Sequence, residues 1–154
     1  MLNKTNTDAV EQPDWAALRR DYQVTGLLHL DASMCALAVR AAGMLAYLAT
    51  PVTDYCDGPV LGADVAEGWQ RTVIGLARVL CYSPAVNAQI MAEFAGVEAS
   101  TCRPKISTEL RLMELVVVPP MAGWDTSGEV WRVVRAALDM NVPVYVLAQQ
   151  AGAA

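Results

Sequence analysis

Hydroxyl, carboxylate and glycine residues gather at residues 121–127 and just after them, where the sequence reads Met-Ala-Gly-Trp-Asp-Thr-Ser. Asp125, Thr126 or Ser127 can cap a following helix, and Gly128 lets a ligand come close to the backbone. The free N–H groups at the start of a helix, together with the helix dipole, favour a phosphate or a carboxylate. The stretch therefore predicts a site for an anion or a polyol. The alternative is a capped helix that binds nothing.

Two apolar segments flank this stretch and predict the elements that position it. Residues 115–118 are Leu-Val-Val-Val and stop at Pro119, which is typical of a parallel strand buried on both faces. Residues 143–147 have the same character. Between them, apolar side chains recur at helical spacing, at Val130, Val133, Val134, Ala137 and Leu138. We expect a strand, a right-handed crossover helix and a second strand, with ligands beyond the carboxyl ends of the strands.

A second loop is expected at the same edge of the sheet. Residues 44–50 form an apolar run that stops at Pro51, which predicts a central strand. A polar turn follows at residues 53–59 and contains Asp54. Because parallel strands all end at one edge, we expect this turn and the stretch 121–127 to share one crevice.

The rest of the chain predicts further helices and strands. Helices are expected at residues 14–22, 32–42, 62–80, 85–95 and 108–112, and a short strand at residues 81–83. From residue 44 onward this alternation indicates an α/β three-layer sandwich, with a mainly parallel sheet and helices on both faces. We expect residues 1–13 to be a flexible arm, residues 14–43 an N-terminal helical extension, and residues 44–150 the α/β domain.

Composition argues against several classes of function. The 154 residues are 55% hydrophobic and 18% charged, with a net charge of −5, so we expect a compact protein that does not bind a nucleic-acid polymer. The sequence contains no GxxxxGK loop and no GxGxxG fingerprint. The four cysteines form no CxxC pair, so we expect neither a metal site nor a cofactor.

No segment predicts export or membrane insertion. Residues 1–12 lack the basic start and apolar run of a signal peptide, and the apolar region 24–51 is interrupted by His29, Asp31 and Arg40. We therefore expect a cytoplasmic protein with reduced cysteines. His29 is the only histidine, lies in an apolar setting, and is not expected to be catalytic.

Three short pieces of sequence carry a family resemblance. They are Tyr-Leu-Ala-Thr-Pro at residues 47–51, Tyr-Ser-Pro at residues 82–84, and Glu-Leu-Val-Val-Val at residues 114–118 followed by Gly-Trp-Asp-Thr-Ser at residues 123–127. Together they resemble the nucleoside 2-deoxyribosyltransferase superfamily, and within it a group of uncharacterised bacterial domains. The resemblance covers residues 44–147 and implies a flavodoxin-like (Rossmann-like) fold and a homo-oligomer. It also implies an enzyme that cleaves or exchanges the N-glycosidic bond of a nucleoside or nucleotide through a carboxylate nucleophile.

The resemblance implies roles for individual residues. Tyr47 matches a tyrosine that steadies the nucleophile, Ser127 a residue that helps to hold a 5′-phosphate, and Glu114 an acidic residue that supports the site. The expected substrate-binding set is completed by Thr50, Pro51, Asp54, Gly123, Trp124 and Gly128. The nucleophilic glutamate of the family aligns with Val133, and a valine cannot attack an anomeric carbon.

Glu129 is an alternative nucleophile, because it lies one helical turn before Val133 and on the same helix face. In a second interpretation, Thr126 and Glu129 form a capping box, which has this spacing. The sequence leaves both interpretations open. Asp54 likewise has two interpretations. It can bind a sugar hydroxyl or assist proton transfer to the leaving base, or it can form hydrogen bonds to the backbone of its own turn. Trp124 can stack on a base or pack on the core.

Three functions are therefore consistent with the sequence. The first is a nucleoside or nucleotide N-glycosidase or deoxyribosyltransferase. The second is a catalytically inactive domain of the same fold that binds a nucleotide. The third is an assembly domain whose residues 1–30 hold subunits together.

Overall fold

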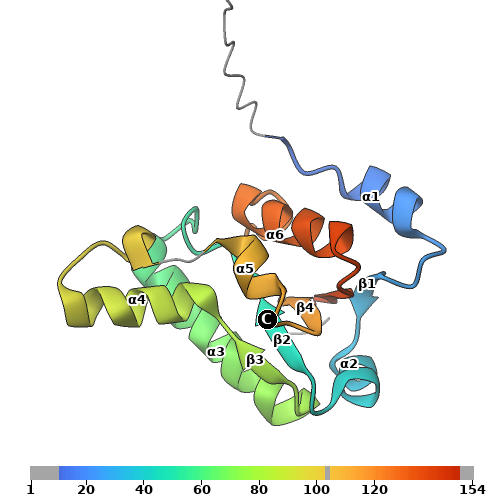
Figure 1. Cartoon of the computed structure of the whole chain (residues 1–154), viewed down its shortest axis with the longest axis horizontal. Helices are drawn as coiled ribbons and strands as arrows, with labels where there is room; N and C mark the ends of the chain where they lie inside the picture. The colour runs from blue at the N-terminus through green and yellow to red at the C-terminus, as the bar shows by residue number, and fades with distance from the viewer. Residues whose placement is uncertain (1–10, 103–104, 150–154) are drawn as a thin grey trace, which may run out of the picture.

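The structure is a computed structural model that describes residues 11–102 and 105–149, in which five parallel strands form one sheet with helices on both faces (Figure 1). The strands are β1 (Leu28–Ala32), β2 (Leu45–Leu48), β3 (Leu80–Tyr82), β4 (Leu115–Val118) and β5 (Val144–Leu147). All four strand pairings are parallel. The predicted α/β three-layer fold with a mainly parallel sheet is therefore confirmed.

The strand order is β1-β5-β4-β2-β3. Without β1, the other four strands follow the order 2-1-3-4, which is the beginning of the flavodoxin-like order 2-1-3-4-5. The fifth position is filled by β1, which comes from the N-terminal part of the chain and pairs with β5. The sheet thus has a flavodoxin-like arrangement in which the fifth strand precedes the other four in the sequence.

The strand β1 was not predicted, because only helices were expected between residues 14 and 43. Those helices are present as α1 (Trp15–Tyr22) and α2 (Met34–Ala41), and β1 lies between them. Its sequence, Leu-His-Leu-Asp-Ala, is short, and its side chains are half-buried or exposed. Such an edge strand lacks the continuous apolar run by which central parallel strands are recognised. Of the expected flexible arm, residues 1–10 lie outside the described residues.

Four further α-helices follow in the described part of the chain, namely α3 (Pro59–Ala77), α4 (Pro84–Ala95), α5 (Ile106–Leu110) and α6 (Gly128–Asp139), together with a short 3-10 helix, η1 (Ala99–Cys102). The helix expected at residues 62–80 starts earlier and ends earlier than predicted. Pro59 occupies its first turn, where a missing N–H costs nothing. Arg78 adopts a left-handed conformation and ends it, so that Leu80 begins β3.

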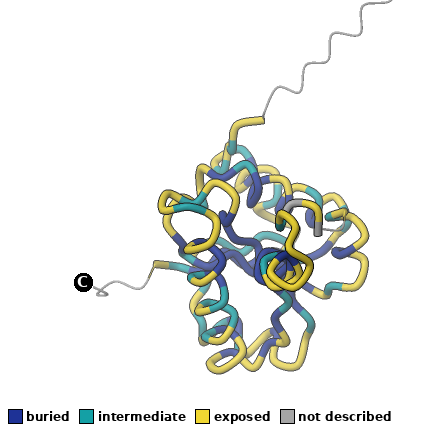
Figure 2. The backbone as a smooth tube through the Cα atoms, turned by 90° about the vertical axis from the view of Figure 1, so that its left-hand side faces the viewer, coloured by how far each residue is buried: buried dark blue, intermediate teal, exposed yellow. Residues whose placement is uncertain are grey.

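Each face of the sheet has its own buried cluster. One cluster packs Tyr47, Val116 and Val144 against the apolar side of α6 and against residues of α1 and α5. The other packs Leu48, Val117 and Tyr145 against α2 and α3. Figure 2 shows the buried segments in the middle of the molecule with exposed backbone around them. Within residues 11–102 and 105–149, no helix has the length and apolar character needed to cross a membrane.

Candidate functional site

The carboxyl ends of β2 and β4 lie side by side. These are the two strands between which the order of strands in the sheet reverses its direction. The two strands are neighbours, with Tyr47 opposite Val116. From β2 the chain continues through α3 to β3 on one side, whereas from β4 it continues through α6 to β5 on the other. Since α3 and α6 cover opposite faces, the loops that lead to them diverge here. Open parallel sheets bind ligands at such a position, and the region between the two loops is called the crevice below.

Two hydrogen bonds connect the loops across this crevice. The backbone N–H of Thr53 donates to Oε2 of Glu129 at 3.0 Å. The hydroxyl of Ser127 donates to Oδ1 of Asp54, also at 3.0 Å. The expectation that the turn after β2 and the stretch 121–127 meet at one edge is therefore confirmed.

The carboxylate of Glu129 belongs to this crevice and not to a capping box with Thr126. The N-cap of α6 is Ser127, whose hydroxyl accepts from the backbone N–H of Val130 at 3.3 Å. Glu129 is consequently the second residue of the helix, whereas a capping box requires the third. The side chain of Thr126 donates to the carbonyl of Gly123. The capping-box interpretation is wrong because the helix begins one residue later than it requires.

Tyr47 and Val133 lie in the same buried cluster between β2 and α6. Each side chain is only 1% exposed, so Val133 serves to pack the helix on the sheet. Glu129 is one helical turn closer to the loops and is 8% exposed. The helix face that the family resemblance assigns to the nucleophile is thus the face that carries Glu129.

A second buried carboxylate, Glu109 of α5, was not predicted. The phenol of Tyr82 donates to its Oε1 at 3.2 Å, and the Glu109 side chain is 6% exposed. Tyr82 also makes an edge contact with Tyr47, with ring centroids 6.4 Å apart. In the sequence, Tyr82 is part of the Tyr-Ser-Pro piece, but nothing near it points to Glu109 as its partner. A helix of five residues is too short for its buried side to be read from spacing.

Glu114 lies at the opposite edge of the sheet from the crevice. It precedes β4, and its Oε2 accepts from the backbone N–H of Leu45 at 2.8 Å, where β2 begins. A four-residue strand separates the two edges by roughly 13 Å. The expected role of Glu114 in supporting the nucleophile is therefore not compatible with its position.

Thr50 and Pro51 follow β2 and are both buried. The hydroxyl of Thr50 has no hydrogen-bond partner among the described residues, although its side chain is only 4% exposed. Buried hydroxyl groups usually have a partner in the protein or in ordered water. Thr50 therefore brings an available hydroxyl to the end of β2.

Gly123 and Trp124 form the outer part of the loop after β4. Gly123 has φ +81°, a conformation that favours glycine, and it turns the chain towards α6. The indole of Trp124 is half-buried against Trp15 of α1, with ring centroids 4.9 Å apart. Nε1 of Trp15 donates to the carbonyl of Asp125 at 2.7 Å. Trp124 thus packs on the N-terminal helix, as the core-packing alternative expected.

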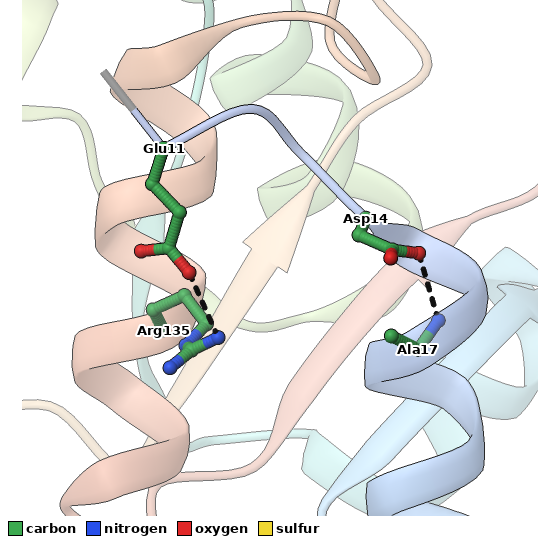
Figure 3. A network of polar contacts seen from close by, with 4 residues as sticks. All are labelled: Glu11, Asp14, Ala17 and Arg135. Atoms are coloured by element: carbon green, nitrogen blue, oxygen red, sulfur yellow. Dashed lines mark hydrogen bonds and ion pairs between the residues drawn. The ribbon is translucent and has the colours of Figure 1, made fainter. Parts of the chain in front are cut away.

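The segment before α1 is held against α6. Glu11 lies 3.3 Å from Arg135 of α6, and the carboxylate of Asp14 accepts from the backbone N–H of Ala17 at the start of α1 (Figure 3). The exposed ion pair contributes little by itself. This ion pair places the segment before α1 beside α6, and the bond from Trp15 to Asp125 places the start of α1 beside the loop after β4.

An apolar cavity of about 590 Å³ adjoins the crevice. Val52 and Thr53 of the loop after β2 line it, together with the alanine side of α4 at Ala85, Ala88 and Ala92. Its volume is typical of a small-molecule site. Thr53 therefore belongs both to the wall of this cavity and to the hydrogen bond with Glu129.

In the described ranges, no three histidine, cysteine or acidic side chains are grouped so as to hold a metal ion. Cys35 and Cys56 are exposed thiols, whereas Cys81 belongs to β3 and is buried in the cluster that packs against α2 and α3. Burial raises the pKa of the Cys81 thiol from 9.0 to about 12. Cys81 is therefore a packed, protonated thiol at neutral pH.

The fold and the crevice define an α/β protein with a flavodoxin-like strand arrangement and a polar site where two neighbouring loops diverge. A scan against protein-family models, a search of curated proteins and a search of solved structures gave no match for this chain.

Proposed function

We propose that the crevice between β2 and β4 cleaves or exchanges the N-glycosidic bond of a nucleoside or nucleotide, with Glu129 as the nucleophile. The observation that carries the proposal is the hydrogen bond from Thr53 N–H to Glu129 across the crevice. It holds a largely buried carboxylate against the loop that follows β2. A nucleophile that is already oriented loses little freedom when the substrate binds.

The chemistry that we propose has two steps. A carboxylate oxygen of Glu129 attacks the anomeric carbon as the bond to the base breaks, and the base leaves with the electron pair and takes up a proton from water. The resulting glycosyl ester is then attacked by water, which releases the sugar, or by a second base, which forms a new nucleoside. The first outcome is hydrolysis and the second is transfer.

Other residues of the crevice fit the parts of such a substrate. Ser127, at the N-terminus of α6, offers its hydroxyl and the nearby N–H groups to a 5′-phosphate. Asp54 accepts a hydrogen bond from Ser127 and can exchange it for one from a sugar hydroxyl. Thr50 adds a buried hydroxyl at the end of β2. The apolar cavity beyond Thr53 is large enough for a base.

The test is to incubate the protein with a panel of nucleosides and nucleoside monophosphates and to measure free base by chromatography. Glu129→Gln should lower base release by about three orders of magnitude or more, because the amide is not a nucleophile. Glu114→Gln is the matched control. Each carboxylate accepts from one backbone N–H beside β2, and each glutamine keeps an oxygen for that bond.

Two outcomes would contradict the proposal. One is that no compound of the panel releases base although the protein is folded. The other is that the Glu129→Gln and Glu114→Gln variants lose activity equally, since a carboxylate at the far edge of the sheet cannot reach the same bond.

The alternative function is a domain that binds a nucleotide without turnover. Val133 favours it, because the position that the resemblance assigns to the nucleophile is filled by a core side chain. Under this alternative, nucleotides raise the melting temperature of the wild type and of Glu129→Gln alike, and no free base appears.

A further inference from the structure

A separate cavity of about 590 Å³ lies beside the edge strand β1, away from the crevice of Glu129. Its polar lining consists of Arg19, Gln23, His29, Arg40 and Tyr145, which come from α1 and its C-terminal end, β1, α2 and β5. None of these residues belongs to the loops after β2 and β4. The cavity therefore offers a second site with its own chemistry.

The charge of this cavity is opposite to that of the protein. The chain has 11 basic and 16 acidic residues. Two arginines from different helices, Arg19 and Arg40, nevertheless line the same cavity. Arg19 lies 3.4 Å from the carboxylate of Asp31, and both side chains are exposed. A guanidinium carries five N–H donors, so this single contact leaves most of the donors of Arg19 for a ligand.

The imidazole of His29 is held in a fixed orientation at this cavity. Its ring stacks on that of Tyr145, with centroids 4.4 Å apart and an angle of 12° between the planes. A nitrogen of Arg40 lies 3.4 Å from Nδ1 of His29. Because a guanidinium can only donate, this contact assigns the acceptor role to Nδ1. The proton of the neutral ring is then on Nε2, which makes Nε2 a further donor.

We infer that this cavity binds a small organic or inorganic anion that carries a phosphate or carboxylate group. Arg19 and Arg40 line this cavity together with His29, Gln23 and Tyr145, and each of these five side chains carries at least one hydrogen-bond donor. Asp31 is the carboxylate that faces this set, and it bonds to Arg19. An anion that bridges Arg19 and Arg40 takes over that contact with charge-assisted hydrogen bonds. This site does not depend on the proposed glycosyl transfer.

His29 provides a specific reporter, because the chain contains one histidine. The wild-type protein is labelled with ¹⁵N and ¹³C, and the imidazole signals are followed by NMR while inorganic phosphate is added at fixed pH. A parallel titration with sodium chloride matches the ionic strength. We expect the His29 signals to shift saturably with phosphate and not with chloride.

Variants test whether the two arginines are responsible. Arg40→Gln and Arg19→Gln should each weaken phosphate binding by about tenfold, because each removes charge-assisted hydrogen bonds. Arg20→Gln is the control, since Arg20 is the exposed neighbour of Arg19 and lies beside Asp21. It should bind phosphate as the wild type does.

Three results would overturn the inference. They are His29 signals that do not respond to phosphate, His29 signals that respond equally to chloride, and equal phosphate binding by the three arginine variants. The wild-type titration decides the first two without any mutation. Circular dichroism of each variant shows whether a loss of binding occurs in a folded protein.

Discussion

The carboxylate of Glu129 accepts a hydrogen bond of 3.0 Å from the backbone N–H of Thr53, a residue 76 positions earlier in the chain. Glu114 makes a corresponding bond of 2.8 Å to the N–H of Leu45 at the other end of β2. A glutamate therefore binds the backbone beside each end of the same central strand. Only Glu129 lies at the carboxyl edge, where the loops after β2 and β4 meet. The following predictions test the parts of the molecule that maintain this arrangement.

Replacement of Ser127 by alanine should destabilise the protein by about 1 to 2 kcal/mol, because Ser127 both caps α6 and bonds to Asp54. Thr126→Ala is the control, since the exposed Thr126 hydroxyl bonds only to the nearby carbonyl of Gly123 in the described structure. Urea denaturation measures both. Equal losses of stability would mean that Ser127 is not the cap. If Ser127 also holds a phosphate, its loss should raise KM for monophosphates more than for nucleosides.

Replacement of Trp15 by phenylalanine should loosen the loop after β4, because it removes the hydrogen bond of 2.7 Å to the carbonyl of Asp125. We expect a loss of about 1 kcal/mol in the free energy of unfolding. The amide of Thr126, which bonds to Gly123, should also exchange faster with solvent. Trp69→Phe is the control on the opposite face of the sheet. If both variants leave the exchange of this amide unchanged, α1 does not support the loop.

Replacement of Gly62 by alanine should destabilise the protein by about 1 to 3 kcal/mol through overpacking. A Cβ at this position would lie 2.9 Å from Cβ of Tyr55 and 3.1 Å from the carbonyl oxygen of Val52, which belong to the loop after β2. Gly68 lies in the same helix, and a Cβ there would have nothing within 4 Å, so Gly68→Ala should stabilise by about 0.5 to 1 kcal/mol. Thermal denaturation of the two variants should therefore shift in opposite directions. Shifts in the same direction would contradict the close approach at Gly62.

The buried thiol of Cys81 should make the protein less stable at alkaline pH. Its pKa is raised from 9.0 to about 12 in the folded state, so between these values the unfolded chain loses a proton that the folded chain keeps. The contribution to stability is complete below pH 9.0 and is lost as the pH rises towards 12. Cys81→Ala should show a smaller alkaline decrease in the free energy of unfolding, measured by urea denaturation. An equal decrease in both proteins would refute this role.

The candidate site could be predicted in part because some of its signals are local. The apolar runs that end at Pro51 and Pro119 mark where β2 and β4 stop, and the loops after them were expected at one edge. The spacing of apolar residues also identified α6. The cap could not be chosen among three adjacent polar residues, because each has a side chain able to accept from the helix N-terminus. A shift of one residue then decided whether Glu129 completes a capping box or faces Thr53.

The sequence by itself determined the alternation of strands and helices, the parallel sheet and the positions of its central loops, because periodicity and proline stops act over a few residues. Only the tertiary structure decided that β1 fills the fifth position of the sheet, that Glu114 lies at the far edge, and that Arg19 and Arg40 line one cavity. These relationships join residues that are distant in the chain, so they depend on strand order and on the packing of helices against the sheet. Local preferences of the residues do not specify them.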